Sequence, residues 1–321
     1  MKKVNLNIPF EVPVKAPHYI TGLIKYLNDE FDQVSVADNL VSKYHDDKSS
    51  KYYNMSAQDI ISKWTETGQR AIFIGNALDD YVGLMTEPEK QKLTKTQWSQ
   101  KVDWVNDEDI YNRTNAWNNY WACLEEGGWE MVAREIPLFY TVNGHIIGGR
   151  ADMIVYNKRL NNITIIDWKT ADKIDKDKFT KLAHGPIANL YQDKATSYGI
   201  QVAFYKMALR NILPDELKDI NIDTCIIQIC SSGRIIRTKN NISLTDSELI
   251  KLLSWCIEED DKAKGKTSKL TDVKMPNTST FETELRDLLN RHCIDVKYNI
   301  SDVKLAKYII NTLDALKEVN K

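Results

Sequence analysis

The chain has 321 residues, of which 42% are hydrophobic and 27% are charged, a composition typical of a globular protein with a buried core. No apolar run approaches the roughly 18 residues of a membrane-spanning helix, which argues against an integral membrane protein and against a membrane partner. Lys and Arg number 43 against 45 Asp and Glu, a formal net charge of −2. A surface that is basic throughout is therefore excluded, and any nucleic-acid contact must be a local patch.

The cysteines and the amino end indicate the cellular compartment. There are five cysteines, and none belongs to a Cys-x-x-Cys pair (Cys123, Cys225, Cys230, Cys256 and Cys293). An odd and scattered set is typical of reduced thiols, and not of a disulfide framework or a zinc ribbon. The first seven residues lack the pattern of a secretory signal or a transit peptide. We therefore expect a cytoplasmic protein.

Helices dominate the predicted structure of the first 128 residues. Residues 1–55 contain three early prolines and are expected to form an extended lead-in. Ser56 and Asp59 resemble a capping box at the start of a first helix, and apolar spacing predicts a second helix over 71–84. Residues 87–128 are polar and helical in character, and we interpret them as a helical insertion.

Three predicted strands follow. Runs of β-forming residues over 130–140 and 146–156 flank the dipeptide Asn143-Gly144, which is a strong hairpin signal. A third run over 163–169 follows another turn. The middle of the chain is therefore predicted to be an antiparallel meander.

The rest of the chain alternates again between helices and strands. We expect a helix, a hairpin, a helix and two terminal helices (191–212, 223–230 with 234–238, 244–263, 278–290 and 302–318). This order predicts an α/β fold, a mixed β-sheet core flanked by helices. We place the core at 56–262 and a helical C-terminal extension at 263–321.

Charged residues stand at matching places on two of the predicted strands. Asp152 follows Gly148-Gly149 by three residues, and Asp167 and Lys169 stand at the end of the next strand. Side chains alternate along a strand, so Asp167 and Lys169 share a face, about 7 Å apart. An adjacent pairing of the two strands can bring Asp152 beside Asp167.

Two adjacent carboxylates indicate a metal site. Their repulsion amounts to about 4 kcal/mol at an effective dielectric constant near 20, and a divalent hard cation is the usual partner that offsets it. Lys169 could then orient or deprotonate a water molecule, or stabilise charge on a phosphoryl group. The alternative is a solvated ion pair on an exposed strand, against which Ile163, Ile165 and Ile166 make the second strand look buried.

A predicted helix supplies a further polar pair. Gln201 and Tyr205 are four residues apart and so project from one helix face. They could bind phosphate oxygens or position the strand lysine. Alternatively, they flank the apolar core without a chemical role.

Together these motifs resemble the PD-(D/E)XK nuclease superfamily, in particular its RecB-like branch with the phage and mitochondrial-genome-maintenance exonucleases. The resemblance covers about residues 56–210 and rests on Gly-x-x-Asp152, Ile166-Asp167-Trp168-Lys169-Thr170 and Gln201-x-x-x-Tyr205. It implies a restriction-endonuclease-like fold and a Mg²⁺- or Mn²⁺-dependent DNA nuclease. The expected activity is that of an exonuclease in DNA replication, recombination or processing.

The resemblance also assigns roles to residues. It implies that Asp152 and Asp167 are metal ligands together with the Trp168 carbonyl, and that Lys169 is catalytic. The residues expected to contact nucleic acid are Gln201, Tyr205, Thr170 and Arg150.

Two further acids enter through the same resemblance. Glu135 matches an acidic position that precedes Gly-x-x-Asp in these enzymes, and it could be an outer ligand of the metal or of water, although Pro137 leaves its direction open. The family usually carries a helical Gly-x-x-x-His whose histidine joins the metal shell. Here Gly75 is followed by Asp79 at the histidine's place, which puts the exonuclease mode in question more than hydrolysis itself.

The expected partners follow from this assignment. The substrate is DNA, either single-stranded or an end-containing duplex, with a helicase or single-strand-binding protein as a possible protein partner, in a bacterial or phage-infected cell. Two lysine-rich stretches, 169–194 and 262–274, could follow a phosphate backbone, although the second reads better as a solvated loop. The aromatic set Trp117, Tyr120 and Trp121 could stack bases, although a core stripe fits its spacing better.

Three alternatives remain at this point. Some RecB-like nucleases hold an iron–sulfur cluster, and the cysteine spacing here argues against one. A structure-specific endonuclease is a rival within the same class. A catalytically silent module that binds DNA or a helicase is a rival from a different class.

Overall fold

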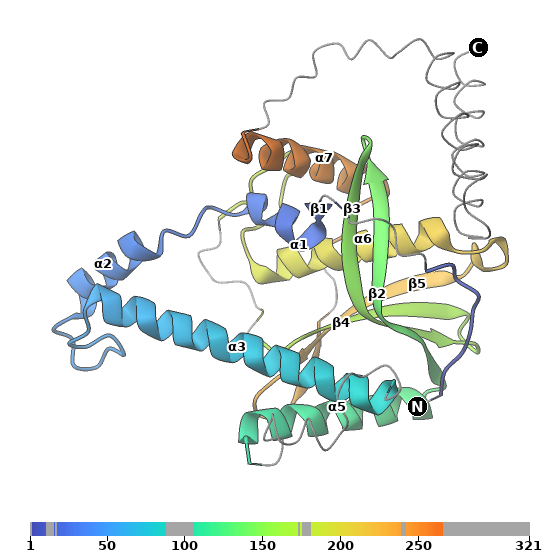
Figure 1. Ribbon diagram of the computed structural model, residues 1–321, viewed down its shortest axis with the longest axis horizontal. Coiled ribbons are helices and arrows are strands. Elements are labelled where there is room, and N and C mark those ends of the chain that lie inside the picture. Colours follow the sequence, from blue (N-terminus) through green and yellow to red (C-terminus); the bar gives the residue numbers. More distant parts are fainter. Residues whose placement is uncertain are drawn as a thin grey trace, which may run out of the picture. The chain divides into compact units, whose positions relative to one another are not determined.

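Figure 1 shows the chain as a computed structural model, which describes residues 2–10, 16, 18–87, 106–172, 174, 181–238 and 242–265. The chain divides into two compact units, Met1–Lys264 and Gly265–Lys321. The two predicted terminal helices and most of the stretch 262–274 lie outside the described residues. The elements of the first unit carry the site.

Helices precede and follow a run of three consecutive strands, and the bounds of all the elements in chain order are as follows. They are β1 (His18–Tyr19), α1 (Ile20–Leu23), the 3₁₀ helix η1 (Ile24–Leu27), α2 (Gln33–Tyr44), α3 (Ala57–Thr86), α5 (Glu108–Glu126), β2 (Trp129–Val142), β3 (His145–Asn157), β4 (Asn162–Lys169), α6 (Lys194–Ile212), the 3₁₀ helix η3 (Asp215–Leu217), β5 (Asn221–Ile229), β6 (Ile235–Thr238) and α7 (Asp246–Ala263).

The strands form one mixed sheet, as the sequence predicted. Its order is β1-β3-β4-β5-β6, and β2 pairs with the other edge of β3. The pairs β2–β3, β3–β4 and β5–β6 are antiparallel, whereas β1–β3 and β4–β5 are parallel. The β2–β3 turn at Asn143-Gly144 has φ angles of 49° and 78°, the left-handed conformation that a tight hairpin requires. The predicted meander is therefore confirmed.

One edge of β3 is shared between two partner strands. β1 pairs with Ile147 and Gly148, whereas β4 pairs with the stretch from Met153 to Asn157. Along this edge the described strands leave the segment between Gly148 and Met153 without a ladder partner. The sheet therefore opens beside this segment, which contains Asp152.

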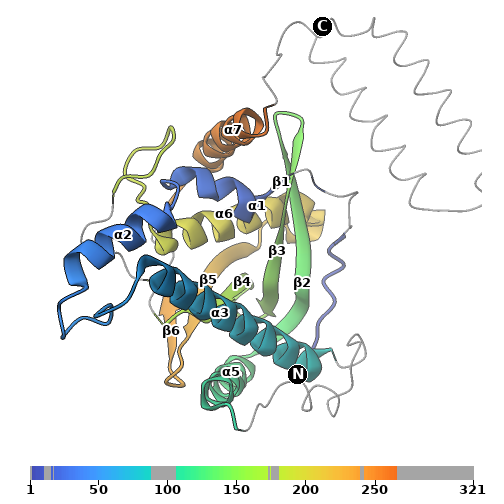
Figure 2. The same ribbon diagram turned by 60° about the vertical axis from the view of Figure 1, so that its left-hand side comes forward.

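Helices cover both faces of the sheet (Figures 1 and 2). Buried residues of α1, α6 and α7 pack with β3, β4 and β5 in one core cluster, and buried residues of α3 and α5 pack with the sheet in another. Trp117 and Trp121 are only 1% and 6% exposed, and the Trp117 ring centroid lies 4.9 Å from that of Trp168. The two α5 tryptophans therefore belong to the core, in agreement with the core-stripe interpretation.

The amino-terminal part differs from its prediction. The helix starts after Ser56 with the predicted capping box to Asp59, but the expected break before residue 71 is absent, and one helix, α3, spans both predicted helices. No proline interrupts this segment, and Gly68 alone costs only about 1 kcal/mol in a helix. The expectation of an extended segment over 1–55 is wrong where α1, η1 and α2 form, because all three early prolines precede residue 18. None of the described helices has the length and apolar content that crossing a membrane requires.

Candidate active site

Two aspartates occupy opposed positions where the β3–β4 ladder ends. The antiparallel register pairs Met153 with Ile166, so Asp152 and Asp167 are the next residues across from each other. The strands separate here, and the Asp152 carboxylate accepts a hydrogen bond from the Trp168 backbone N–H at 2.8 Å. Asp167 is completely buried. The strand pairing brings the two acids together, as the motif suggested.

Lys169 lies beside Asp167 on the same face of β4. The distance between Lys169 Nζ and Asp167 Oδ2 is 2.5 Å, and the exposed fractions of the two side chains are 19% and 1%. Nζ also lies 4.8 Å from the ring centroid of Tyr198 on α6, within the range of a cation–π contact. The amine is therefore held between a carboxylate and an aromatic ring.

The polar pair of α6 points at the same place. Gln201 Nε2 donates a hydrogen bond to the Tyr205 hydroxyl at 2.7 Å and a longer one to Asp167 Oδ1 at 3.4 Å. Both side chains are buried. Tyr198, one helical turn before Gln201, faces the site as well, and its spacing from Gln201 was the signal that could have identified it.

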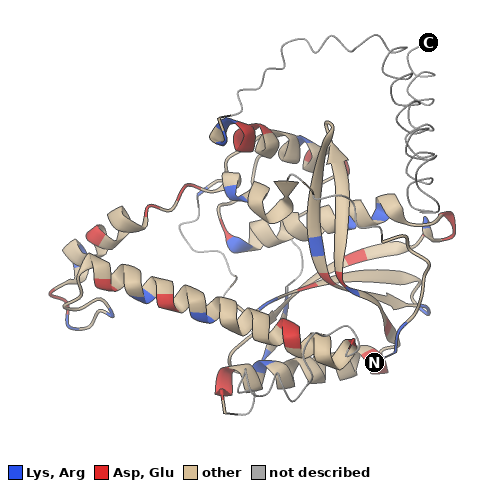
Figure 3. Ribbon diagram, viewed as in Figure 1, with Lys and Arg blue, Asp and Glu red and all other residues tan. Residues whose placement is uncertain are grey.

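Asp79 reaches the site from α3, on the other side of the sheet from α6. Its Oδ1 accepts a hydrogen bond from Trp168 Nε1 at 2.7 Å, and its backbone carbonyl accepts one from Arg134 at 2.6 Å. Figure 3 shows acidic positions spread along α3 and others on the strands of the sheet. The acid in the family histidine's place is therefore fixed next to the Trp168 side chain.

Glu135 lies on β2, which pairs with the other edge of β3, at the position opposite Asp152. The register pairs Arg134 with Met153 and Ile136 with Ala151, and Glu135 between them has a φ of 52°. A positive φ in a non-glycine strand residue is strained, and such strain often marks a functional site. The Glu135 carboxylate pairs with Arg150 Nε at 2.7 Å. Arg150 is largely exposed and remains within reach of a ligand.

A cavity of about 710 Å³ opens beside this arrangement. It lies where β1 and β4 diverge along β3. The polar side chains that line it include Asp79, Glu135, Arg150, Asp152, Gln201 and Tyr205. Asp167 and Lys169 are not among the lining residues. Gln201 and Asp152 do line it. Gln201 bonds to the buried Asp167, and Asp152 bonds to the backbone of Trp168, which stands between Asp167 and Lys169.

Burial and like charge determine the protonation of these groups. Burial, and then Asp167, raise the pKa of Asp152 well above its usual value. Burial also raises the pKa of Asp167, although Lys169 opposes this. Burial alone would lower the pKa of Lys169, but Asp167 and Asp152 outweigh it and raise this pKa, so the amine stays protonated at neutral pH. Burial likewise raises the pKa of Asp79 and of Glu135.

The donor set fits a hard divalent cation. Asp167 Oδ2 is buried, and the protein group that approaches it is the Lys169 amine of the ion pair. Among the described residues no three His, Cys, Asp or Glu side chains gather as a full set of metal ligands. Mg²⁺ commonly takes one or two carboxylates and keeps several waters. Asp152, Asp167 and the Trp168 carbonyl supply donors of this kind.

The raised pKa of Asp152 predicts that replacing this buried acid by an amide increases the stability of the fold. A carboxyl group whose pKa is raised on folding stabilises the fold fully below its unfolded-state pKa, and this contribution is lost as the pH rises through the folded-state pKa. The amide of Asp152→Asn does not ionise, so in metal-free protein at pH 7 this variant keeps the stability that the carboxylate loses. Its amide oxygen can still accept the hydrogen bond from the Trp168 backbone N–H. We expect its Tm to rise by roughly 2–4 °C, the effect of about 1 kcal/mol in a domain of this size. A thermal melt in excess chelator that shows no rise, or a rise that is equally large at pH 4, would contradict this.

Gly149 allows Tyr205 to reach the site. A Cβ at this position would lie 2.5 Å from a Tyr205 ring carbon and 2.9 Å from an Ile20 methyl carbon. Gly149→Ala should therefore destabilise the fold by roughly 1–3 kcal/mol through overpacking. Gly68→Ala is the control, because nothing lies within 4 Å of that Cβ and the change should add about 1 kcal/mol in helix α3. Denaturant unfolding that gives both variants the same change in stability would refute this account.

The remaining candidates lie around this centre or away from it. Thr170 follows Lys169 and is half-buried, with its Oγ1 3.8 Å from the Cβ position of Gly75. Cys225, Cys230 and Cys256 are buried free thiols and Cys123 is an exposed one, whereas Cys293 lies outside the described residues. Of the basic stretch 169–194, residues 173 and 175–180 also lie outside them.

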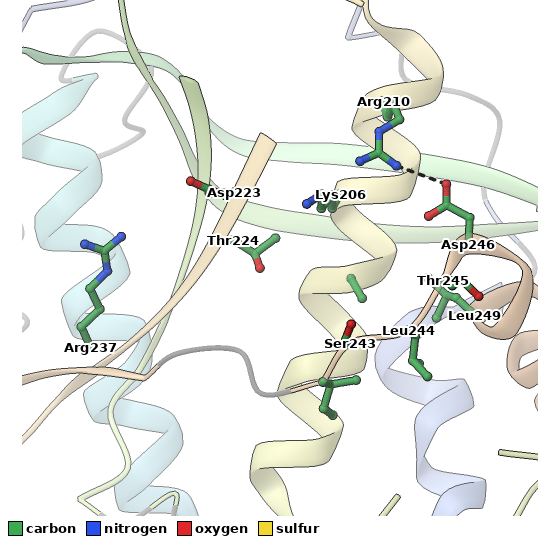
Figure 4. Close-up of a pocket in the computed structure, with 12 residues that line it drawn as sticks. Lys206, Arg210, Asp223, Thr224, Arg237, Ser243, Leu244, Thr245, Asp246 and Leu249 are labelled. Atoms are coloured by element: carbon green, nitrogen blue, oxygen red, sulfur yellow. Dashed lines mark hydrogen bonds and ion pairs between the residues drawn. The ribbon is translucent and has the colours of Figure 1, made fainter. Parts of the chain in front are cut away.

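A second cavity, of about 980 Å³, lies against another face of α6 (Figure 4). Lys206 and Arg210 of α6 line it, at about 140° and 180° around the helix from Gln201. Its two acids are not adjacent and each has a partner: Asp246 pairs with Arg210 at 3.2 Å, and Asp223 accepts a hydrogen bond from Asn162 at 2.8 Å. This cavity lacks the paired acids of the first one.

Comparisons with known proteins bear on the identity of this site. A family model for the PD-(D/E)XK nuclease superfamily matches residues 65–293. No curated protein matches the chain. One similar solved structure is that of SSO0001, with 15% identity, 59% of this chain and 75% of that chain covered, and a TM-score of 0.27. Another is a candidate exonuclease from Eubacterium rectale, with 16% identity, 75% and 89% covered, and a TM-score of 0.31. The family model, and not these two structures, carries the assignment.

Proposed function

Because the chain belongs to the PD-(D/E)XK nuclease superfamily, we propose that it is a Mg²⁺- or Mn²⁺-dependent deoxyribonuclease that degrades DNA from an end. The observation that carries the proposal is the meeting of Asp152, Asp167 and Lys169 beside an open cavity. We further propose residues 56–262 as the nuclease core, with 87–128 as an insertion and 263–321 as an extension.

The acids are proposed to hold the metal ion. Asp152 and Asp167 would be its carboxylate ligands and the Trp168 carbonyl a third, with Asp79 and Glu135 at the border of the site. When bound, the ion supplies Lewis acidity at phosphorus and lowers the pKa of a bound water molecule. In the absence of a cation, burial raises the pKa of both acids, and the charge of Asp167 raises that of Asp152 further.

Lys169 is proposed to act as a cation and hydrogen-bond donor. Its raised pKa keeps it protonated, so it is suited to orient the attacking water and to stabilise negative charge on the phosphoryl oxygens. Of the roles that the sequence left open, this favours stabilisation over deprotonation. Gln201 fixes the Asp167 carboxylate, and Tyr198 and Tyr205 enclose the pair. Arg150 and Thr170 are proposed to contact the DNA strand.

The experiment that tests the function compares DNA with and without ends. End-labelled single strands, duplexes and covalently closed circles of the same sequence are incubated with the protein and Mg²⁺ or Mn²⁺. We expect labelled nucleotides from the linear substrates and intact circles. Nicking or linearisation of the circles would establish the endonuclease alternative, and intact DNA in every arm would establish the silent-module alternative.

A further inference from the structure

The cavity that exposes Asp152 has a second, aromatic end. Gly148 on β3 pairs with Phe139 on β2 and with Tyr19 on β1. Residues opposite each other in a sheet project from the same face. Phe139 and Tyr19 therefore stand on the two sides of a glycine, and both line the cavity that Asp79, Glu135 and Asp152 line.

Gly148 provides the space that this end requires. A Cβ there would lie 2.9 Å from a Phe139 ring carbon and 3.0 Å from the Ala16 Cβ. Because no side chain projects from Gly148, the Phe139 ring lies over the backbone of β3. The neighbouring strand supplies Tyr19, which is 53% exposed. The exposed Tyr19 ring and the half-buried Phe139 ring, on either side of Gly148, form an apolar platform at the wall of a polar cavity.

Tyr19 is exposed but its backbone is held in place. The preceding residue, His18, is buried, and its Nδ1 lies 3.0 Å from Asp260 Oδ2 on α7. Its ring centroid also lies 5.4 Å from that of His145 on β3. Tyr19 is therefore an exposed side chain on a backbone that is held in place by its buried neighbour.

Three positions of β3 place different chemical groups in sequence along the cavity. Gly148, Arg150 and Asp152 occupy every second position of β3, and Gly148 lies about 13 Å from Asp152 at roughly 3.3 Å per residue. An apolar platform, a largely exposed cation and an acid therefore follow one another along the cavity. A single strand offers a base, a phosphate and a second phosphate in the same order. Inside a duplex both faces of an internal base are covered by its neighbours, so the two rings favour an unpaired base.

We propose that Phe139 and Tyr19 form a stacking subsite for an unpaired nucleobase a few nucleotides from the scissile phosphate, and that the substrate is a single-stranded end. This inference rests on the proposed function. Every base has an aromatic face, so the subsite tolerates all four bases and distinguishes single strands from duplexes.

Binding of a fluorescent strand tests the subsite directly. Oligonucleotides that carry 2-aminopurine near one end are titrated with the protein in Ca²⁺, and the quenching of this base reports its stacking. We expect quenching with the parent and with Tyr19→Phe, which keeps the ring. Tyr19→Leu and Phe139→Leu should lose the quenching and bind the single strand roughly 5- to 100-fold more weakly. Tyr53→Leu is the matched control, because Tyr53 is 44% exposed and does not line the cavity.

The outcomes separate the subsite from the function. If the parent binds and degrades single strands and both leucine variants do so equally well, the subsite is refuted while the nuclease stands. If the parent neither binds nor degrades any DNA, the proposed function itself fails. Tyr19→Leu removes an exposed ring and should melt within a few degrees of the parent. If Phe139→Leu fails to fold, Tyr19→Leu alone decides the question.

Discussion

Lys169→Ala is expected to lower the rate constant of DNA hydrolysis by roughly 10²- to 10³-fold at saturating Mg²⁺, the usual effect of removing one charge-stabilising donor. The amine lies 2.5 Å from Asp167 and is protonated at neutral pH, so its removal deletes a positive charge beside the proposed metal site. Binding of single-stranded DNA should change little. The measurement is single-turnover cleavage of an end-labelled strand, with affinity determined in parallel.

The control for this prediction is another lysine of the same domain. Lys206 lies on the face of α6 that borders the second cavity (Figure 4), away from the paired aspartates. Lys206→Ala should cleave at the parental rate. Parental cleavage by Lys169→Ala, or an equal loss in both variants, would show that the lysine has no role in the chemistry.

Removal of divalent ions should abolish hydrolysis altogether. Asp152 and Asp167 are buried opposite each other, and their raised pKa values show that the site is unfavourable for two uncompensated negative charges. Protein dialysed against EDTA should lose activity, and added Mg²⁺ or Mn²⁺ should restore it. The same ions should raise the Tm of the parent, since a ligand that binds only the folded state stabilises it.

Two outcomes would contradict the metal dependence. One is degradation of labelled DNA that persists in excess EDTA. The other is a Tm that does not respond to Mn²⁺ in the parent. Asp152→Asn serves as the control for the second readout, because it removes a proposed ligand but keeps the hydrogen bond from Trp168.

Much of the fold could be predicted because its signals are local. The β2–β3 hairpin depends on alternating residues around Asn143-Gly144, whose positive φ angles that dipeptide tolerates. The capping boxes at Ser56 and Thr245 mark the starts of α3 and α7. The predicted length of α3 was wrong, because the weak apolar periodicity in its exposed half was interpreted as a break between two helices.

The acids of the strands could be predicted for a similar reason. Asp152, Asp167 and Lys169 are placed by alternation along the strands and by the antiparallel pairing of β3 with β4. Other features depend on contacts between distant segments. The bond between Asp79 and Trp168 spans 89 residues, and the pairing of β1 with β3 involves only two residues of β1. Neither leaves a pattern in the sequence, so the position of Tyr19 in the cavity could not be predicted.

Calorimetric titration of Mn²⁺ into metal-free protein tests the central claim most directly. Two carboxylates from neighbouring strands should bind the ion together, so the parent should give a saturable heat signal. Asp167→Asn should abolish that signal while the folded state is retained in a thermal melt. Equal affinities for Mn²⁺ in the parent and in Asp167→Asn would mean that the paired aspartates do not form the metal site of this nuclease.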